Sequence, residues 1–240
     1  MNATENNGKA TARLGMLALI ALILLPASVL VVRAGYWQQG LAVYAISCLT
    51  AAILLLVFTI IALLPGAAGK RRSLAMRGLL VVPGTVLFLS VATSRGDHPA
   101  IHDISTDVVN PPAFSQAPLL RSASDNSLDV NEETLQAQLA AYPDLKPLQT
   151  PLDFDTAFTK ALQTARAMGW EITLNDPKTG LIEAVDTTKI MAFKDDIVIR
   201  VWHQQGASRI DLRSASRVGV SDIGANAQRI RRYIALFKTS

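Results

Sequence analysis

Three apolar segments near the start of the chain constrain its fold more than any other feature. They cover residues 14–32, 41–64 and 74–93. A helix that crosses the hydrocarbon core of a bilayer needs roughly 20 mainly apolar residues, and the first two segments contain no charged side chain. The third is long enough if Arg77 extends to the headgroups, and Pro83 falls in its first turns, where a lost backbone hydrogen bond costs least. We therefore predict a transmembrane region of three helices over residues 1–94.

Basic residues in the connecting loops predict the orientation of these helices. The link after the second segment carries Lys70, Arg71, Arg72 and Arg77 and no acidic residue, whereas the link after the first carries only Arg33. Short loops rich in Lys and Arg stay in the cytoplasm. We therefore expect a multi-pass protein of the bacterial inner membrane, with a cytoplasmic N-terminus and a periplasmic C-terminal domain.

A cleaved signal peptide over residues 9–28 is the alternative interpretation of the first segment. A basic start and an apolar run favour it, but apolar residues continue through Val32 without a polar cleavage region. That continuity is more typical of a membrane anchor than of a leader. We therefore keep the anchor as the expected structure.

The net charge of +4 does not indicate a nucleic-acid-binding protein. Seven of the 23 Lys and Arg residues but only one of the 19 acidic residues precede residue 94, which leaves 16 basic and 18 acidic residues in the rest of the chain. The excess of basic charge therefore belongs to the membrane loops, and nucleic acid is not expected as a partner. The single cysteine, Cys48, lies in the second apolar segment, so the soluble part has no cysteine for a disulfide, a thiol nucleophile or a metal cluster.

Residues 95–152 predict an extended segment and a surface loop with one short helix. Four prolines between residues 95 and 118 exclude a continuous helix there, and residues 121–131 are rich in Ser, Asp and Asn. Asn131 is a suitable N-cap for a helix that ends at Ala141, with Leu135 and Leu139 on one side.

Residues 153–240 predict the α+β core of the C-terminal domain. Apolar residues at helical spacing indicate a helix from Asp153 to about Met168, and a period of two then indicates two hairpins. The expected strands cover residues 170–174, 181–187, 196–203 and 208–217. A last helix from Asp222 should bury Ile223, Ala227, Ile230, Ile234 and Phe237. The predicted fold class is therefore α+β: three transmembrane helices, then a two-layer domain with a four-stranded antiparallel sheet and flanking helices.

Arginines on the last two predicted strands form a candidate anion-binding site. Arg209, Asp211, Arg213 and Arg217 alternate onto one face of a strand, opposite Ile210 and Leu212. Arg200 on the preceding strand could share their face. The start of the last helix would add free amide groups close to Ser221 and Asn226. Because guanidinium groups match carboxylate and phosphate oxygens, a small anion or a lipid headgroup is the ligand that this pattern favours.

Internal ion pairs are the alternative role for these arginines, and the distribution of charge along the chain favours it over anion binding. Residues 94–186 carry six basic and 14 acidic side chains, whereas residues 187–240 carry ten basic and four acidic ones. Pairing between the two halves would neutralise much of the arginine face, and Glu171 and Glu183 on neighbouring strands are candidate partners.

Two histidines and two aspartates just after the third apolar segment form a weak metal-site candidate. His98, His102, Asp103 and Asp107 are residue types that bind zinc. Pro99 prevents a helix that would place both imidazoles on one face, and Asp side chains in loops commonly cap turns. His203, alone near a strand end, is better explained as a surface residue than as a base. We assign no catalytic residue, no bound metal and no cofactor.

Several stretches of the C-terminal half together resemble a family known as domain of unknown function 1499 (DUF1499), found in bacterial membrane proteins. They are residues 101–107, 110–114, 142–145, 195–201, 214–219 and 221–226. The resemblance implies a shared domain and a common membrane attachment, but it implies no activity and no catalytic residues. We expect a non-enzymatic binding role in the cell envelope, with membrane lipids, an envelope protein or a small anion as partner. The alternative is a membrane-anchored hydrolase or metal-dependent enzyme that uses the cluster from His98 to Asp107.

Overall fold

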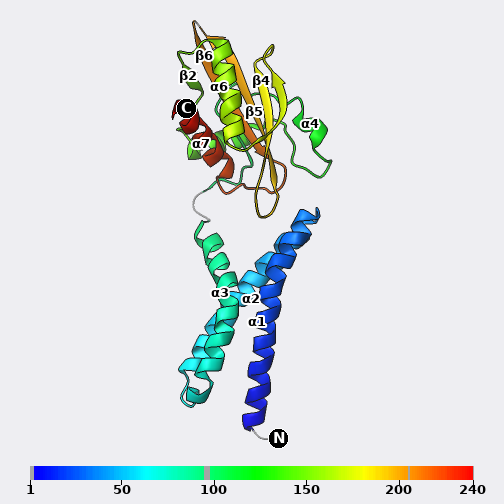
Figure 1. Cartoon of the computed structure of the whole chain (residues 1–240), viewed down its shortest axis with the longest axis vertical. Helices are drawn as coiled ribbons and strands as arrows, with labels where there is room; N and C mark the ends of the chain where they lie inside the picture. The colour runs from blue at the N-terminus through cyan, green and yellow to red at the C-terminus, as the bar shows by residue number, and fades with distance from the viewer. Residues whose placement is uncertain (1–2, 95–97, 205, 240) are drawn as a thin grey trace. The chain divides into compact units, whose positions relative to one another are not determined.

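A computed structural model describes residues 3–94, 98–204 and 206–239 of the chain (Figure 1). It separates the chain into two compact units. One contains the three long helices, and the other contains a domain of helices and strands.

Three helices in the first unit are long and apolar enough to cross a membrane. They are α1 (Ala3–Arg33), α2 (Trp37–Leu63) and α3 (Arg71–Ser94), with a short 3₁₀ turn, η1 (Ala68–Lys70), before the third. This result confirms the three predicted segments. The helix α3 begins at Arg71, so Pro83 lies near its middle rather than in its first turns.

Small residues let these helices approach each other closely. A Cβ atom added to Gly40 would lie 2.5 Å from the side chain of Val32, and one added to Gly84 would lie 2.7 Å from Ala51. Close backbone approach at small residues is the usual basis of helix packing in membranes.

The second unit is built on one antiparallel sheet, which confirms the predicted α+β class. Its strands are β1 (Asp103–Ser105), β2 (Leu148–Thr150), β3 (Glu171–Asp176), β4 (Leu181–Thr187), β5 (Lys194–Gln204) and β6 (Ala207–Ser216). The order is β1-β6-β5-β4-β3, and β2 pairs with β6 beside β1. The sheet therefore has six strands rather than the four predicted, because β1 and β2 are three residues long and too short to show a period of two.

Helices α6 (Phe154–Ala167) and α7 (Ala225–Thr239) cover one face of the sheet (Figure 1). Their buried side chains pack on alternate residues of β5 and β6, such as Ile199 and Leu212. The predicted start of α6 at Asp153 is confirmed, and Asp153 is its N-cap, since its side chain accepts a hydrogen bond from the amide of Thr156. Tyr233 of α7 is fully buried, and its hydroxyl donates to the carbonyl of Ala161.

The start of the last helix differs from the prediction. Helix α7 begins at Ala225, because Ile223 and Gly224 have positive φ values of 52° and 77° and cannot belong to a right-handed helix. Asp222 still acts as a cap, since its carboxylate accepts from the amides of Gly224 and Asn226. Ile223 is 46% exposed rather than buried, so its predicted place in the apolar stripe is wrong.

Helix α5 (Glu132–Ala141) confirms the predicted N-cap, because the Asn131 side chain accepts from two backbone amides. Its buried face differs from the prediction: Gln138 is buried, whereas Leu139 is 44% exposed. The Gln138 amide group accepts from the backbone N–H of Ser105 and donates to its C=O. Gln138 thus satisfies backbone groups of β1 that no further strand pairs.

Candidate functional site

Charged side chains occupy the sheet face opposite α6 and α7. Strand alternation places Arg200 of β5 and Arg209, Asp211 and Arg213 of β6 on this face, while Ile199 and Leu212 point to the helices. Arg200 and Asp211 are directly opposite each other in the register. The predicted coincidence of the two arginine faces is therefore present in the structure.

Residues 106–130, which include the short helix α4 (Ala117–Leu120), form a covering segment over this charged face. This covering segment supplies many of the partners of the charged side chains. Asp107 Oδ2 lies 3.1 Å from Arg200 Nη2 and 2.6 Å from Arg209 Nη2. Asp211 accepts from the same two guanidinium groups at 2.7 and 2.8 Å and is completely buried. Both guanidinium groups also stack on the ring of Trp202, at 5.0 and 5.1 Å from its centroid.

Arg213 is the most deeply buried arginine of β6. Its guanidinium group binds the carboxylate of Asp103 in a bidentate manner and donates to the carbonyls of Pro112 and Leu128. The ring of Phe114 covers it. Arg213 therefore binds β1 and fixes two points of the covering segment to the sheet.

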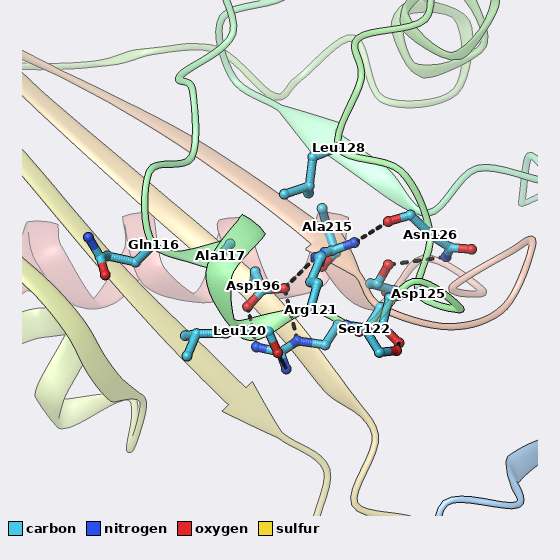
Figure 2. A network of polar contacts seen from close by, with 12 residues as sticks. Gln116, Ala117, Leu120, Arg121, Ser122, Asp125, Asn126, Leu128, Asp196 and Ala215 are labelled. Atoms are coloured by element: carbon cyan, nitrogen blue, oxygen red, sulfur yellow. Dashed lines mark hydrogen bonds and ion pairs between the residues drawn. The ribbon is translucent and has the colours of Figure 1, made fainter.

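A third group of contacts surrounds Asp196 of β5 (Figure 2). Arg121 Nε lies 2.8 Å from Asp196 Oδ2, and Arg217 Nη2 lies 2.7 Å from Asp196 Oδ1. Figure 2 shows that Arg121 also reaches the carbonyls of Asn126 and Ala215. Asp196 is 1% exposed, so two cations share one buried carboxylate.

Glu183 of β4 is a buried carboxylate bound by amide and hydroxyl donors. Its oxygens accept from the backbone amides of Ser115, Gln116 and Ala117 and from the Ser115 hydroxyl, at 2.5 to 3.1 Å. Glu183 therefore does not pair with the arginines in the way that the ion-pair alternative suggested; aspartates do.

The remaining residues of the predicted anion site lie elsewhere. Asn226 is completely buried and binds Ser214, which alternates with Arg213 along β6 and so faces the helices. Its amide nitrogen donates to the His102 carbonyl and the Ser216 hydroxyl, and its oxygen accepts from Arg229. Ser221 is exposed in the loop before α7 and donates to the carbonyl of Pro99.

The structure thus brings together Arg200, Arg213 and Arg217 on one face, with Asn226 across the sheet. Every one of these arginines already binds at least one carboxylate. Among the described residues, no buried polar side-chain atom lacks a hydrogen-bond partner. This geometry favours a structural role for the arginine face, because binding an external anion would require it to displace an internal carboxylate.

A pocket of about 330 Å³ lies beside β1 and α5. Its polar lining includes His102, Asp103, Asp129 and Arg213, together with the N-cap Asn131 and Thr134 at the start of α5. Leu135, Pro111 and Val130 provide apolar walls. A volume of this size suits a small ligand.

The four metal-site candidates do not converge on one point. Asp103 and Asp107 bind guanidinium groups, and Asp107 Oδ1 also accepts from the amides of Val109 and Asn110. His98 Nδ1 lies 3.3 Å from the Tyr142 hydroxyl. Burial, and to a lesser extent the charge of Asp222, raises the pKa of this hydroxyl above its usual value, although Arg231 opposes the change. Within the described part of the chain, no three His, Cys, Asp or Glu side chains are grouped so that they could hold a metal ion.

His203 is exposed near the end of β5, and its Nε2 accepts from the amide of Gly206.

Comparison with known families gives one match. Residues 103–237 match the family described as protein of unknown function (DUF1499). The chain belongs to the DUF1499 family. The match begins at the first residue of β1 and ends in α7, so it covers the whole sheet of the second unit and confirms the resemblance seen in the sequence. No curated protein matches the chain.

Several residues of the DUF1499 domain that build the charged face and the pocket were not identified from the sequence. Asp196 stands beside an apolar run, and a charge at such a strand is the signal that could have indicated a buried polar layer. Arg121 and Asp129 lie in a segment without periodicity. Nothing in that segment indicates which strand it would cover.

Proposed function

We propose that this DUF1499 protein is a membrane-anchored binding protein whose domain holds a small, positively charged ligand in the pocket beside β1 and α5. The lining of that pocket carries the proposal. It combines a defined volume of about 330 Å³ with titratable side chains and the amide and hydroxyl groups of α5.

The charges of the lining indicate the ligand class. Asp103 and Arg213 neutralise each other through their bidentate contact. Asp129 is exposed, and the hydroxyl of Ser127 orients its carboxylate by donating a hydrogen bond of 2.6 Å. The remaining charge of the pocket is therefore negative, which favours an ammonium group or another cationic ligand over an anion.

Binding is favoured over catalysis because Asp103, the carboxylate next to His102 in the chain, is already engaged. Asp103, which lines the pocket with His102, accepts two hydrogen bonds from the Arg213 side chain at 3.0 and 2.6 Å. An Asp held in this way cannot also orient an imidazole without weakening its hold on a buried cation. The contacts of Asp103 therefore favour binding over the hydrolase alternative.

The proposed location of the domain is the periplasmic side of a bacterial inner membrane. The support is the distribution of basic residues: four in the link before α3 and its first turns, against Arg33 alone at the end of α1. A C-terminal alkaline phosphatase fusion should be active and a C-terminal green fluorescent protein fusion dark. The reverse pattern would place the domain in the cytoplasm.

Ligand binding can be tested by stabilisation of the purified full-length protein in detergent. A ligand that binds only the folded state raises the midpoint of urea unfolding. We expect putrescine or choline to raise the midpoint and succinate to leave it unchanged, and Asp129→Asn to remove the effect. Asp125→Asn is the matched control, because Asp125 lies in the same loop but binds Ser122 in a turn. The proposal fails if no cation stabilises the protein, or if Asp129→Asn responds as the wild type does.

A further inference from the structure

The loop between β6 and α7 exposes two large aliphatic side chains. Val220 is 76% exposed and Ile223 is 46% exposed. Ile223 has a φ of 52°, a conformation that is rare for a β-branched residue and costs energy. The loop therefore holds an isoleucine outward at a position where glycine or asparagine would be less strained.

Hydrogen bonds fix the loop in this conformation. Ser221 Oγ accepts from the amide of Ile223, and Asp222 accepts from the amide of Gly224 at 2.8 Å and from that of Asn226 at 2.7 Å. Strained backbone that is fixed by its surroundings is characteristic of functional segments. The exposure of Ile223 thus follows from a defined loop structure.

The same loop binds the chain close to the end of α3. The Ser221 hydroxyl donates to the carbonyl of Pro99, and the amide of Asp222 donates to the carbonyl of Ile101. Helix α3 ends at Ser94, five residues before Pro99. The loop therefore binds a part of the chain that follows, within a few residues, a helix long and apolar enough to cross a membrane.

We propose that Val220 and Ile223 contact the surface of the lipid bilayer that holds α3. Two exposed aliphatic side chains on a short loop can enter the boundary between headgroups and acyl chains, where apolar surface is removed from water. The contact restrains the domain next to the bilayer. It depends only on α3 crossing the membrane and is independent of the ligand pocket and of the side on which the domain lies.

Site-directed spin labelling of the full-length protein in lipid nanodiscs tests this contact. In a Cys48→Ser background, a nitroxide is attached at Val220→Cys, and its collision rates with oxygen and with a polar nickel chelate are measured. Val109→Cys is the matched control, because Val109 is 91% exposed. It lies beside Asp107, which binds Arg209 at the start of β6. Arg209 and Arg217 are eight residues apart, or about 26 Å along a strand, so Val109 is at the other end of the sheet.

We expect the label at position 220 to be protected from the nickel chelate and accessible to oxygen, and the label at position 109 to show the reverse. A label at Ile223→Cys should behave like the one at 220. Equal accessibility at positions 220 and 109, whether both are protected or both exposed, would overturn the proposal. Unchanged urea midpoints of the labelled proteins would confirm that the domain remains folded.

Discussion

Replacement of Glu183 by glutamine should destabilise the domain strongly, although the two side chains have nearly the same shape. In the wild type, one carboxylate oxygen accepts from the amide and hydroxyl of Ser115, and both oxygens contact the amides of Gln116 or Ala117. In the variant, one oxygen becomes an NH₂ group. It would then face backbone amides that are themselves donors.

The size of the effect follows from the hydrogen bonds that the substitution removes. A hydrogen bond to a charged group contributes about 1.5–3 kcal/mol, and a buried donor left without a partner adds a further cost. Because the new NH₂ group cannot accept from the amides that it faces, about two such hydrogen bonds are broken, and we expect the free energy of unfolding to fall by about 3 kcal/mol. With a urea dependence of about 2 kcal/mol/M for a domain of this size, the midpoint should fall by about 1.5 M.

Urea unfolding of the full-length protein in detergent, followed by tryptophan fluorescence, measures this change. Glu171→Gln is the matched control, since Glu171 is exposed on the neighbouring strand β3 and its replacement should change stability by less than about 0.5 kcal/mol. If the two variants have midpoints within about 0.3 M of each other, the carboxylate at position 183 does not hold the covering segment, and the reasoning is refuted.

Three further substitutions test other parts of the domain. Arg121→Ala should lower the free energy of unfolding by about 3 kcal/mol, because it removes one of two cations from the buried Asp196. Arg231→Ala should lower it by less than about 1 kcal/mol, because the ion pair of Arg231 with Asp144 is exposed. The urea midpoints of the two variants measure this difference. The side-chain hydrogen bond from Arg231 lowers the pKa of Asp144, so the small advantage of the wild type over Arg231→Ala should be present above about pH 4 and disappear as the pH falls through the lowered pKa; a constant difference would contradict this assignment. Gly180→Ala should be poorly folded by circular dichroism, because φ is +71° and the new Cβ would lie 2.1 Å from a backbone oxygen of β5, and a wild-type spectrum and midpoint would show that the turn can relax.

The helical side of the domain could be predicted from the sequence because its apolar residues are periodic. The Asp153 cap and the apolar face of α6 follow from spacing and capping rules, as do the two hairpins. The shared face of Arg200 and Arg213 also follows from strand alternation.

The charged side of the sheet could not be predicted in the same way. It is covered by a loop segment whose contacts are single side chains, such as Arg121 and Asp107, reaching over 70 or more residues. Such contacts leave no local pattern in the chain. Gln138 illustrates the difficulty. It is buried because its side chain binds the backbone N–H and C=O of Ser105, whereas the neighbouring Leu139 is exposed.

The pairing of β1 with β6 has a consequence for how the protein is made. Residues 103–105 leave the ribosome more than 100 residues before their partners at 213–215. Asp103 and Asp107 are likewise synthesised more than 100 residues before Arg213 and Arg209, which bind them. The acidic first half of the domain must therefore remain without its cations until synthesis is nearly complete. Contacts of such long sequence separation form slowly. A chain truncated before β6 would expose an edge of β5 together with unpaired carboxylates, so quality-control proteases should remove incomplete chains efficiently.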